Sequence, residues 1–338
     1  SFLFFSKEKA GIRYLVRSRG LGDVYKRLYL ACFHLPHTNG EFIRQPPRRT
    51  WPGVLQPFDD EPRLAQVFQT YKDWLTIMGV GNVNSLNQAI TGGRSSEVIM
   101  VAEALHERQL ASIARAIASR QPAVRLVAVS GPTSAGKTTF SKRLALQVMA
   151  QGIYPVIISL DDYFVDREAT PRDASGAFDF ESLGALDIAL FQSDMCRLMA
   201  GEEVLLPRYN FKTGRREVGT PLSIGKDHIV MIEGIHGLNP RLTDSLPESA
   251  TFRVFISAFT QLNLDKHNRV PTTDTRLLRR IVRDAAHRGY SAAQTIGRWN
   301  SVRRGEKNHI FPFQNSACLL YTSPSPRDRT RYRMPSSA

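Results

Sequence analysis

Residues 131–138 form a complete phosphate-binding loop. They read Gly-Pro-Thr-Ser-Ala-Gly-Lys-Thr and fit the pattern G-x-x-x-x-G-K-[ST]. An apolar run at 126–129 precedes the loop and a segment of helical character follows it, which is the context that the motif requires. In such a loop the backbone N–H groups and the helix N-terminus bind anionic oxygens. The sequence therefore predicts a site for the phosphates of a nucleoside triphosphate.

The side chains of this loop have expected roles. Lys137 would reach the β- and γ-phosphates, and the hydroxyl of Thr138 would bind Mg²⁺. ATP and Mg²⁺ are thus the expected cofactors. The other expected ATP contacts in the loop are Gly131, Ser134, Ala135, Gly136 and Thr139.

Carboxylates follow two further apolar runs. Asp161 and Asp162 come directly after the run at 155–160, and Glu233 ends the run at 228–232. Two adjacent carboxylates at the mouth of a parallel sheet are costly to desolvate unless they serve a metal or a proton transfer. Glu233 stands where a Walker-B acid would hold Mg²⁺, directly or through water. We favour these roles over helix caps or loop acids.

Four arginines lie three to four residues apart, so they share one face of a predicted helix. They are Arg276, Arg279, Arg280 and Arg283, and Asp274 is suited to cap the helix. Such a face fits a lid that closes over a transferring phosphoryl group and neutralises its charge. A solvated face or a nucleic-acid patch remains the alternative.

The apolar runs also predict the fold class. They lie at 124–129, 155–160, 228–232 and 251–256, with helical stretches between them. This order predicts an α/β fold, namely a three-layer parallel sheet of the P-loop NTPase type with right-handed crossovers. Helical periodicity at 64–75, 84–90 and 96–120 predicts helices over 61–121.

The composition of the chain limits the kinds of ligand and partner that we expect it to bind. The chain has 338 residues with ordinary hydrophobic content, but its formal charge of +14 is high. The arginines crowd most in 269–304, which favours phosphate-bearing ligands over a nucleic-acid tract. Three cysteines at unrelated spacings predict neither disulfides nor a metal knuckle, as in a cytoplasmic protein. No apolar run reaches the length of a membrane helix.

Both ends of the chain are unusual. It begins at Ser1 inside an apolar stretch, so we expect a fragment. Residues 318–338 are rich in Ser, Pro and Arg and resemble translated sequencing-adapter read-through. We therefore expect 318–338 to be a non-native disordered tail that takes the place of a last strand, with a genuine Arg-rich tail as the alternative.

A set of segments occurs in the order seen in the uridine kinase/phosphoribulokinase family, which the chain resembles over residues 122–317. Besides the phosphate-binding loop, these segments are 159–164 (SLDDYF), 178–181 (FDFE), 207–211 (PRYNF), 232–235 (IEGI) and 274–280 (DTRLLRR). The chain resembles in particular the long bacterial uridine kinase-like proteins. By that resemblance, 1–60 is the C-terminal remnant of a threonyl-tRNA synthetase editing-like α+β domain, and 61–121 is its helical connector.

The resemblance implies ATP-dependent phosphorylation of a nucleoside 5′-hydroxyl, of the uridine or cytidine type. It places Asp161 as general base, Arg276 and Arg279 in the catalytic lid, and Arg283 at ATP. The implied substrate contacts are Asp162, Tyr163, Glu181 and Tyr209.

One departure from the family keeps other functions open. Typical members carry a base-reading histidine a few residues after the tyrosine, whereas residues 209–215 here read YNFKTGR. A phosphoribulokinase-like or pantothenate kinase-like acceptor is therefore an alternative. A nucleotide-dependent RNA-binding regulator is another; it predicts salt-sensitive RNA binding, but the chain lacks the usual aromatic-basic RNA platform.

Overall fold

The computed structural model describes residues 62–322, except 174–175, 245–246, 259–261, 266–267 and 269, and three short strands nearer the N-terminus. The chain divides into two compact units, Ser1–Thr70 and Tyr71–Ala338. In the first unit, β1 (Leu3–Lys7), β2 (Arg13–Arg17) and β3 (Cys32–Phe33) form an antiparallel sheet. Most of the expected editing-domain remnant at 1–60 lies outside the described residues, and that assignment stays a prediction.

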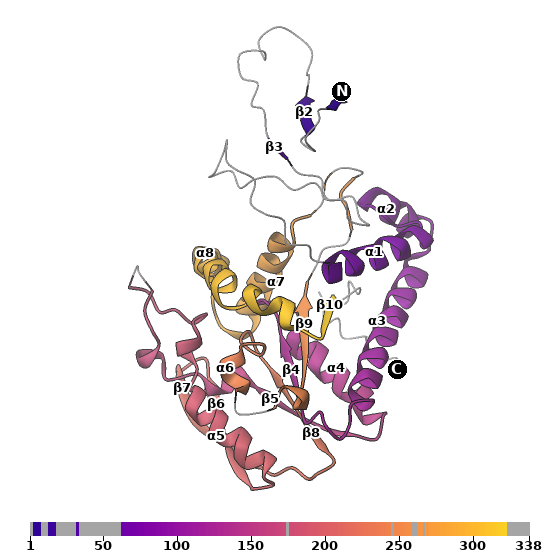
Figure 1. Cartoon of the computed structure of the whole chain (residues 1–338). Coiled ribbons are helices and arrows are strands. Elements are labelled where there is room, and N and C mark those ends of the chain that lie inside the picture. The colour runs from indigo at the N-terminus through magenta and orange to yellow at the C-terminus, as the bar shows by residue number, and fades with distance from the viewer. Residues whose placement is uncertain are drawn as a thin grey trace, which may run out of the picture. The chain divides into compact units, whose positions relative to one another are not determined.

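The second unit is built on a parallel sheet of five strands in the order β10-β9-β4-β8-β5 (Figure 1). Every neighbouring pair in it is parallel. The central strand β4 is buried along its whole length, as its continuous apolar sequence LVAVS requires of a strand covered on both faces. The bounds are β4 (Leu126–Ser130), β5 (Tyr154–Ser159), β8 (His228–Glu233), β9 (Thr251–Ser257) and β10 (Leu319–Thr322). The four strands predicted from the apolar runs are thus confirmed.

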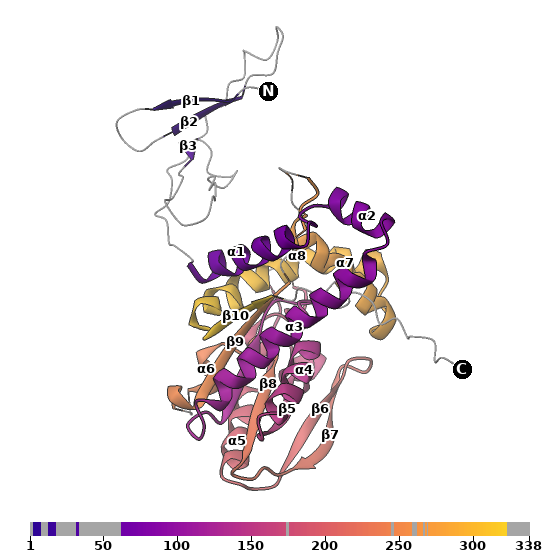
Figure 2. The ribbon, with the colours of Figure 1, turned by 90° about the vertical axis from the view of Figure 1, so that its right-hand side faces the viewer.

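Helices cover both faces of this sheet. On one face, α3 (Ser95–Ala118) and α4 (Lys137–Met149) share a core with β4, β8 and β9, and Figure 2 shows them in front of the strands. On the other face, α5 (Ile188–Met199) packs in a second core with β4, β5 and β8. The predicted three-layer α/β fold is therefore confirmed.

The helical region before the sheet contains α1 (Pro62–Ile77), α2 (Val83–Thr91) and α3, as periodicity predicted. However, α3 belongs to the core on one face of the parallel sheet, because Leu110, Ile113 and Ile117 are buried in it. Arg143 of α4 also bonds Glu103 of α3 at 3.1 Å, and it pairs with Glu107. The predicted boundary at 121/122 thus separates elements that share one core.

The remaining elements are a hairpin and several helices. An antiparallel hairpin of β6 (Val204–Asn210) and β7 (Arg215–Leu222) lies to one side. Helices α7 (Thr272–His287) and α8 (Ala292–His309) lie above the sheet (Figure 1). The short helices are α6 (Pro240–Thr243), η3 (Leu160–Tyr163), η4 (Arg167–Ala169), η5 (Leu183–Ala185), η6 (Glu248–Ala250) and η7 (Phe311–Ser316). Within the described ranges, no helix has the length and apolar character needed to cross a membrane.

The C-terminal boundary differs from the expectation. Leu319–Thr322 form β10, which pairs with β9 at the sheet edge, and Tyr321 is buried against Phe140 with ring centroids 4.6 Å apart. The segment Leu-Leu-Tyr-Thr is apolar enough to complete an edge strand, so the folded part extends past 318 to at least Thr322. The rest of the expected tail, 323–338, lies outside the described residues.

Candidate active site

The phosphate-binding loop connects β4 to α4 and is packed tightly against the sheet. A Cβ at Gly131 would overlap the carbonyl oxygen of Ile256 in β9, so only glycine fits there. Gly136, the N-cap of α4, has φ +96°, a conformation that glycine adopts at little cost. Lys137 Nζ donates to the carbonyl of Gly131 at 3.0 Å and to that of Pro132 at 3.3 Å. Burial lowers the pKa of Lys137, and a bound phosphate would supply the opposite charge.

Thr138 and Glu233, the two expected Mg²⁺ ligands, meet beside the loop. Thr138 Oγ1 donates to Glu233 Oε1 at 2.9 Å, and Ser159 Oγ donates to the same oxygen at 3.4 Å. Burial, followed by the negative charge of Asp161, raises the pKa of Glu233. A cation would relieve both effects, and a hydroxyl with carboxylate oxygens is a donor set that fits Mg²⁺. The part of the chain described here has no cluster of three or more His, Cys, Asp or Glu side chains. Mg²⁺ would therefore complete its coordination with phosphate oxygens and water.

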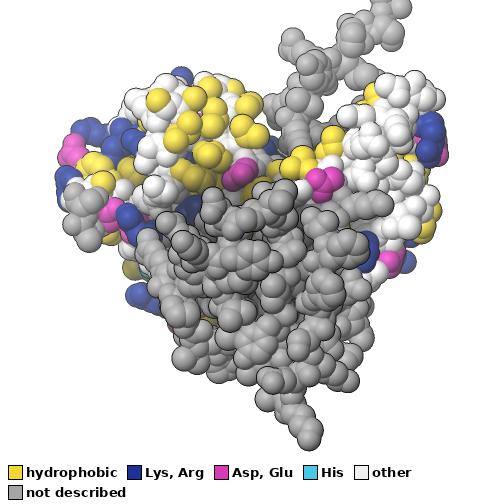
Figure 3. All heavy atoms as spheres, turned by 90° about the horizontal axis from the view of Figure 1, so that it is seen from above, with side chains coloured by type: hydrophobic (Ala, Val, Ile, Leu, Met, Phe, Trp, Pro, Cys, Tyr) yellow, Lys and Arg dark blue, Asp and Glu magenta, His cyan; other side chains and the backbone are white. Residues whose placement is uncertain are grey.

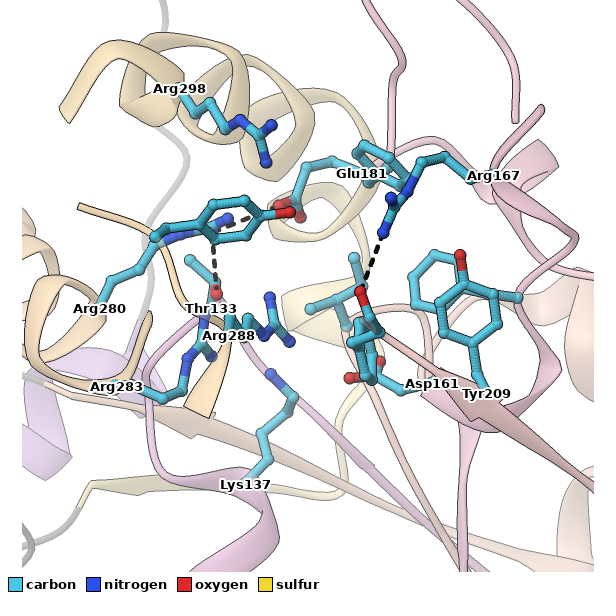
Figure 4. A pocket seen from close by; sticks show the side chains of 15 residues that line it. Thr133, Lys137, Asp161, Arg167, Glu181, Tyr209, Arg280, Arg283, Arg288 and Arg298 are labelled. Carbon is cyan, nitrogen blue, oxygen red and sulfur yellow. Dashed lines mark hydrogen bonds and ion pairs between the residues drawn. The ribbon is translucent and has the colours of Figure 1, made fainter. Parts of the chain in front are cut away.

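A pocket with about 850 Å³ of empty space, open to solvent, adjoins the loop (Figure 4). Lys137 lies at one end and Tyr209 at the other, with Asp161 between them. The remaining lining residues are Thr133, Phe164, Arg167, Phe180, Glu181, Phe211, Ile235, Arg280, Arg283, Arg288, Tyr290 and Arg298. The loop, η3, the hairpin and the two helices above the sheet therefore converge on one site.

Glu181 is the buried carboxylate of this pocket. Its side chain packs so closely on α8 that a Cβ at Gly305 would overlap it. Arg280 lies 3.5 Å from Glu181 Oε1, while Glu181 Oε2 has no hydrogen-bond partner in the described part of the chain. Burial raises the pKa of Glu181, although the charge of Arg280 opposes this effect. A buried carboxylate oxygen without a donor is suited to accept a hydrogen bond from a ligand hydroxyl.

The arginines of α7 divide into two groups. Arg280 and Arg283 line the pocket, and Arg280 also donates to Thr133 Oγ1 at 3.2 Å. The structure corrects the expectation for Arg276, because its guanidinium forms a buried ion pair with Glu306 on α8. Arg279 is half-buried and does not line the pocket.

The outer face of α7 explains this arrangement. Leu278 and Val282 are about two-thirds exposed, and Ile296 on α8 is about half exposed. Figure 3 shows apolar side chains gathered on this side. The guanidinium face of α7 therefore points into the molecule. Arg276 lies one turn before Arg280, where it meets Glu306 instead of the pocket.

Asp162 and Tyr163 also stabilise the fold through hydrogen bonds, and they do not line the pocket. Asp162 Oδ1 accepts from the backbone N–H of Tyr209 at 3.1 Å, which fastens β6 to η3. The hydroxyl of Tyr163, fully buried, donates to Asp194 Oδ2 at 3.1 Å. Successive side chains of a 3₁₀ turn point about 120° apart. Of the residues of η3, Leu160–Tyr163, Asp161 is therefore the one that faces the pocket.

Sequence reasoning missed an aromatic cluster at the far end of the pocket. The ring centroids of Phe164 and Tyr209 are 5.5 Å apart, and those of Tyr209 and Phe211 are 5.1 Å apart. Phe211 lies in one of the segments that carry the family resemblance, so the sequence offered a signal for it.

Other pocket residues lie outside all of those segments, and their side chains meet only in the folded chain. They are Arg167, Arg288, Tyr290 and Arg298.

The chain is similar in sequence to known proteins. The chain matches the model of the phosphoribulokinase/uridine kinase family over residues 126–323, more than half its length. Uridine-cytidine kinase B of Dictyostelium discoideum is 26% identical over 196 residues, which cover 58% of this chain and 73% of that protein. The uridine kinase of Halobacterium salinarum is also 26% identical over 196 residues, which cover 57% and 78%.

Among solved structures, a possible uridine kinase from Bacillus stearothermophilus aligns with 63% of this chain and 98% of that chain. The sequence identity is 16% and the TM-score is 0.43. The family match and the phosphate-binding loop lead to one conclusion: the chain belongs to the phosphoribulokinase/uridine kinase family and is an ATP-dependent P-loop kinase.

Proposed function

We propose that this kinase transfers the γ-phosphoryl group of ATP to the 5′-hydroxyl of a nucleoside of the uridine or cytidine type. One observation carries the proposal: Lys137 of the phosphate-binding loop and the carboxylates of Asp161 and Glu181 line the same pocket. The names of the uridine kinase relatives support a nucleoside acceptor.

The loop end of the pocket would bind the triphosphate. Backbone N–H groups of the phosphate-binding loop, such as that of Gly136, and Lys137 would hold its phosphates. Thr138 and Glu233 would hold Mg²⁺, which when bound neutralises charge on the phosphate oxygens. Arg280 and Arg283 line the pocket beside the loop, so they would neutralise charge that develops on the transferring group.

Asp161 is the proposed general base. It follows β5, and its backbone N–H donates to Ser159 Oγ at 3.3 Å, which fixes the start of η3. Its carboxylate would orient the acceptor hydroxyl and accept its proton as the hydroxyl oxygen attacks the γ-phosphorus in line with the leaving oxygen. Positioning and charge stabilisation supply most of the catalysis in such a transfer.

The other end of the pocket would bind the rest of the acceptor. Glu181 Oε2 would accept a hydrogen bond from a sugar hydroxyl, and the faces of Tyr209 and Phe211 would pack on a planar base. Asp162 would contribute indirectly by fastening the strand that carries Tyr209.

A kinase of another hydroxylated acceptor, phosphoribulokinase-like or pantothenate kinase-like, is the second candidate. The turn between β6 and β7 favours it. That turn contains Gly214, and the side chain of Arg167 packs against it so closely that an added Cβ would lie 2.7 Å from the guanidinium carbon. A cation, and no histidine, therefore occupies this part of the hairpin.

The experiment is Mg²⁺-dependent ADP release with uridine, cytidine, ribulose 5-phosphate or pantothenate, for the wild type and Lys137→Ala. Stimulation by uridine or cytidine that is lost in the variant supports the proposal. Stimulation by one of the other two acceptors alone supports the second candidate and rejects the first. No stimulation by any acceptor, with ATP bound, contradicts both.

A further inference from the structure

One guanidinium is held in place at the end of the pocket where Tyr209 lies. It belongs to Arg167, whose Nη2 donates to the carbonyl of Phe211 at 2.9 Å. The backbone N–H of Arg167 also donates to the carbonyl of Gly214 at 2.8 Å. Gly214 leaves room for the side chain, because an added Cβ there would be 2.7 Å from Nε of Arg167. The hairpin therefore fixes both the backbone and the guanidinium of this residue.

The guanidinium of Arg167 lies near the ring on which an acceptor base would pack. Arg167 and Tyr209 both line the pocket (Figure 4). Burial raises the pKa of Tyr209, and the positive charge of Arg167 is the largest influence that opposes this effect. Because Coulomb interactions fall off with distance, the charge of Arg167 must be close to the phenol. A planar base that packs on Tyr209 would thus present one of its edges to Arg167.

The side chain of Arg167 can donate hydrogen bonds but cannot accept them. A guanidinium has five N–H groups and no acceptor. In the part of the chain that the structure describes, one of these five is used, in the bond to Phe211. The other N–H groups can bond a lone pair on a ligand, whereas a ligand N–H group in the same place would leave both donors unpaired. Arg167 therefore selects for an acceptor atom on the edge of the base.

The carboxylates of the site do not offset this selection. Asp161 and Glu181 are the carboxylates among the pocket-lining residues, and the proposed mechanism uses them for hydroxyl groups. Asp166, next to Arg167, is exposed and accepts from the backbone N–H of Arg216 at 2.8 Å. Asp166 is not a pocket-lining residue. An amino group at this end of the pocket would therefore meet a cation and no carboxylate partner.

Uridine and cytidine differ at the edge that would reach Arg167. The reacting 5′-hydroxyl must lie at Asp161, so the base extends from the ribose toward Tyr209. Position 4 of a pyrimidine lies opposite the ring nitrogen that carries the ribose, so its substituent points farthest from the reacting hydroxyl. That substituent is a keto oxygen in uridine, which accepts hydrogen bonds, and an amino group in cytidine, which donates them.

We infer that Arg167 donates a hydrogen bond to a keto oxygen at position 4 of the base, so that the kinase prefers uridine to cytidine. Arg167 would touch the substrate without taking part in the transfer, so it determines specificity and is not catalytic. Discrimination arises because the wrong base leaves polar groups without partners. The inference rests on the proposed nucleoside function and narrows it from two pyrimidine nucleosides to one.

The test compares kcat/KM for three nucleosides that differ at position 4, with Mg²⁺-dependent ADP release as the readout. They are uridine, cytidine and the riboside of 2-pyrimidinone, which has only hydrogen at that position. Uridine should exceed cytidine by about tenfold or more, which is less than a fully buried site gives because Arg167 is partly exposed. The 2-pyrimidinone riboside should lie between them, since it neither accepts from Arg167 nor opposes it. The differences should lie mainly in KM, because the reacting groups are unchanged.

Substitutions of Arg167 separate recognition of the base from support of the fold. Arg167→Gln, whose amide can either donate or accept, should bring uridine and cytidine within about threefold of each other. Arg167→Glu can only accept and should reverse the preference toward cytidine. Arg167→Lys keeps a charged donor and should keep the preference for uridine. A purely structural role would change the use of both nucleosides alike in every variant.

Arg172→Gln is the matched control. Arg172 lies in the same segment between η3 and η5 and also donates to a backbone carbonyl, that of Gly176, at 2.8 Å. It does not line the pocket. Its variant should keep the preference of the wild type.

Two results would overturn the inference while the proposed function stands. They are use of cytidine by the wild type within about threefold of uridine, and an unchanged preference in Arg167→Gln. Failure of the proposed function looks different, because none of the three nucleosides would then stimulate ADP release. That result would reject the inference as well.

Discussion

Arg276 of α7 and Glu306 of α8 form a buried ion pair that also clamps the phosphate-binding loop. Their side chains are 2% and 1% exposed, and Arg276 Nη2 donates to Glu306 Oε2 at 2.6 Å. The backbone N–H of Thr133 donates to Glu306 at 3.2 Å, and Arg276 donates to the carbonyl of Thr133 at 3.3 Å. Both helices above the sheet are thus fixed to the loop through one residue.

Breaking this pair should be strongly destabilising. Glu306→Gln leaves the Arg276 charge buried without its partner, so we expect a loss of roughly 3–5 kcal/mol in the free energy of unfolding. The double variant Arg276→Met/Glu306→Leu removes both charges and should lose less. Urea unfolding monitored by circular dichroism measures both values. A single variant as stable as the wild type would show that the pair does not fix the helices.

Asp161→Asn should lower kcat roughly 10²- to 10⁴-fold, because the amide cannot accept the proton of the acceptor hydroxyl. Binding of ATP should change little. Asp162→Asn is the matched control, since an amide oxygen can still accept the hydrogen bond from Tyr209. Steady-state ADP release with a working acceptor compares the two. Near-wild-type turnover of Asp161→Asn would mean that another group is the base.

Gly305→Ala should disturb the acceptor site through Glu181. The added methyl group would overlap the Glu181 side chain, so we expect a loss of roughly 1–3 kcal/mol in stability and a raised KM for the acceptor. Gly297→Ala on the same helix is the control. Nothing lies within 4 Å of its added Cβ, and the change should stabilise α8 by up to about 1 kcal/mol. Equal effects of both substitutions would refute the close packing of Glu181 on α8.

The buried His236 should make the free energy of unfolding depend on pH. It is 1% exposed, and burial followed by the charge of His309 lowers its pKa to about 4. The unfolded chain, with a histidine pKa of about 6.5, then binds more protons between pH 6.5 and 4 than the folded chain does. The stabilisation is present above about pH 6.5 and is lost as the pH falls toward 4, with about 2 kcal/mol lost between pH 7 and 5.

The measurement compares urea unfolding of the wild type and His236→Gln at pH 7 and pH 5. The wild type should lose about 2 kcal/mol more than the variant over this interval. Should the variant unfold at pH 7, the imidazole of the wild type can be followed by NMR instead. A titration midpoint near 6.5 would contradict the prediction.

Sequence patterns predicted the sheet well because its strands are continuous apolar runs, as β4 shows. The hairpin was not predicted, since β6 and β7 alternate little and β7 is mostly exposed. The loop residues were predictable because Lys137 and Thr138, the first two residues of α4, stand at a fixed spacing from Gly131.

The sequence predicted which arginines share a helical face, but it could not predict their contacts. Spacing placed Arg276 and Arg283 on one helical face, and the structure agrees. The spacing could not show that Arg276 meets Glu306, thirty residues later, because that contact depends on how α8 packs on α7. Arg167 and Arg298 come together only through the hairpin and the helices above it, so no local pattern reveals them.

The most direct test of the central claim is ³¹P NMR of a reaction that contains the protein, ATP, Mg²⁺ and uridine. The proposed function predicts that the γ-phosphate signal of ATP decays while ADP and a phosphate monoester appear together, with the monoester phosphorus coupled to the 5′-methylene protons. Lys137→Ala should abolish this conversion. ADP with inorganic phosphate and no monoester, or a monoester at any other hydroxyl, would contradict transfer to the nucleoside 5′-hydroxyl.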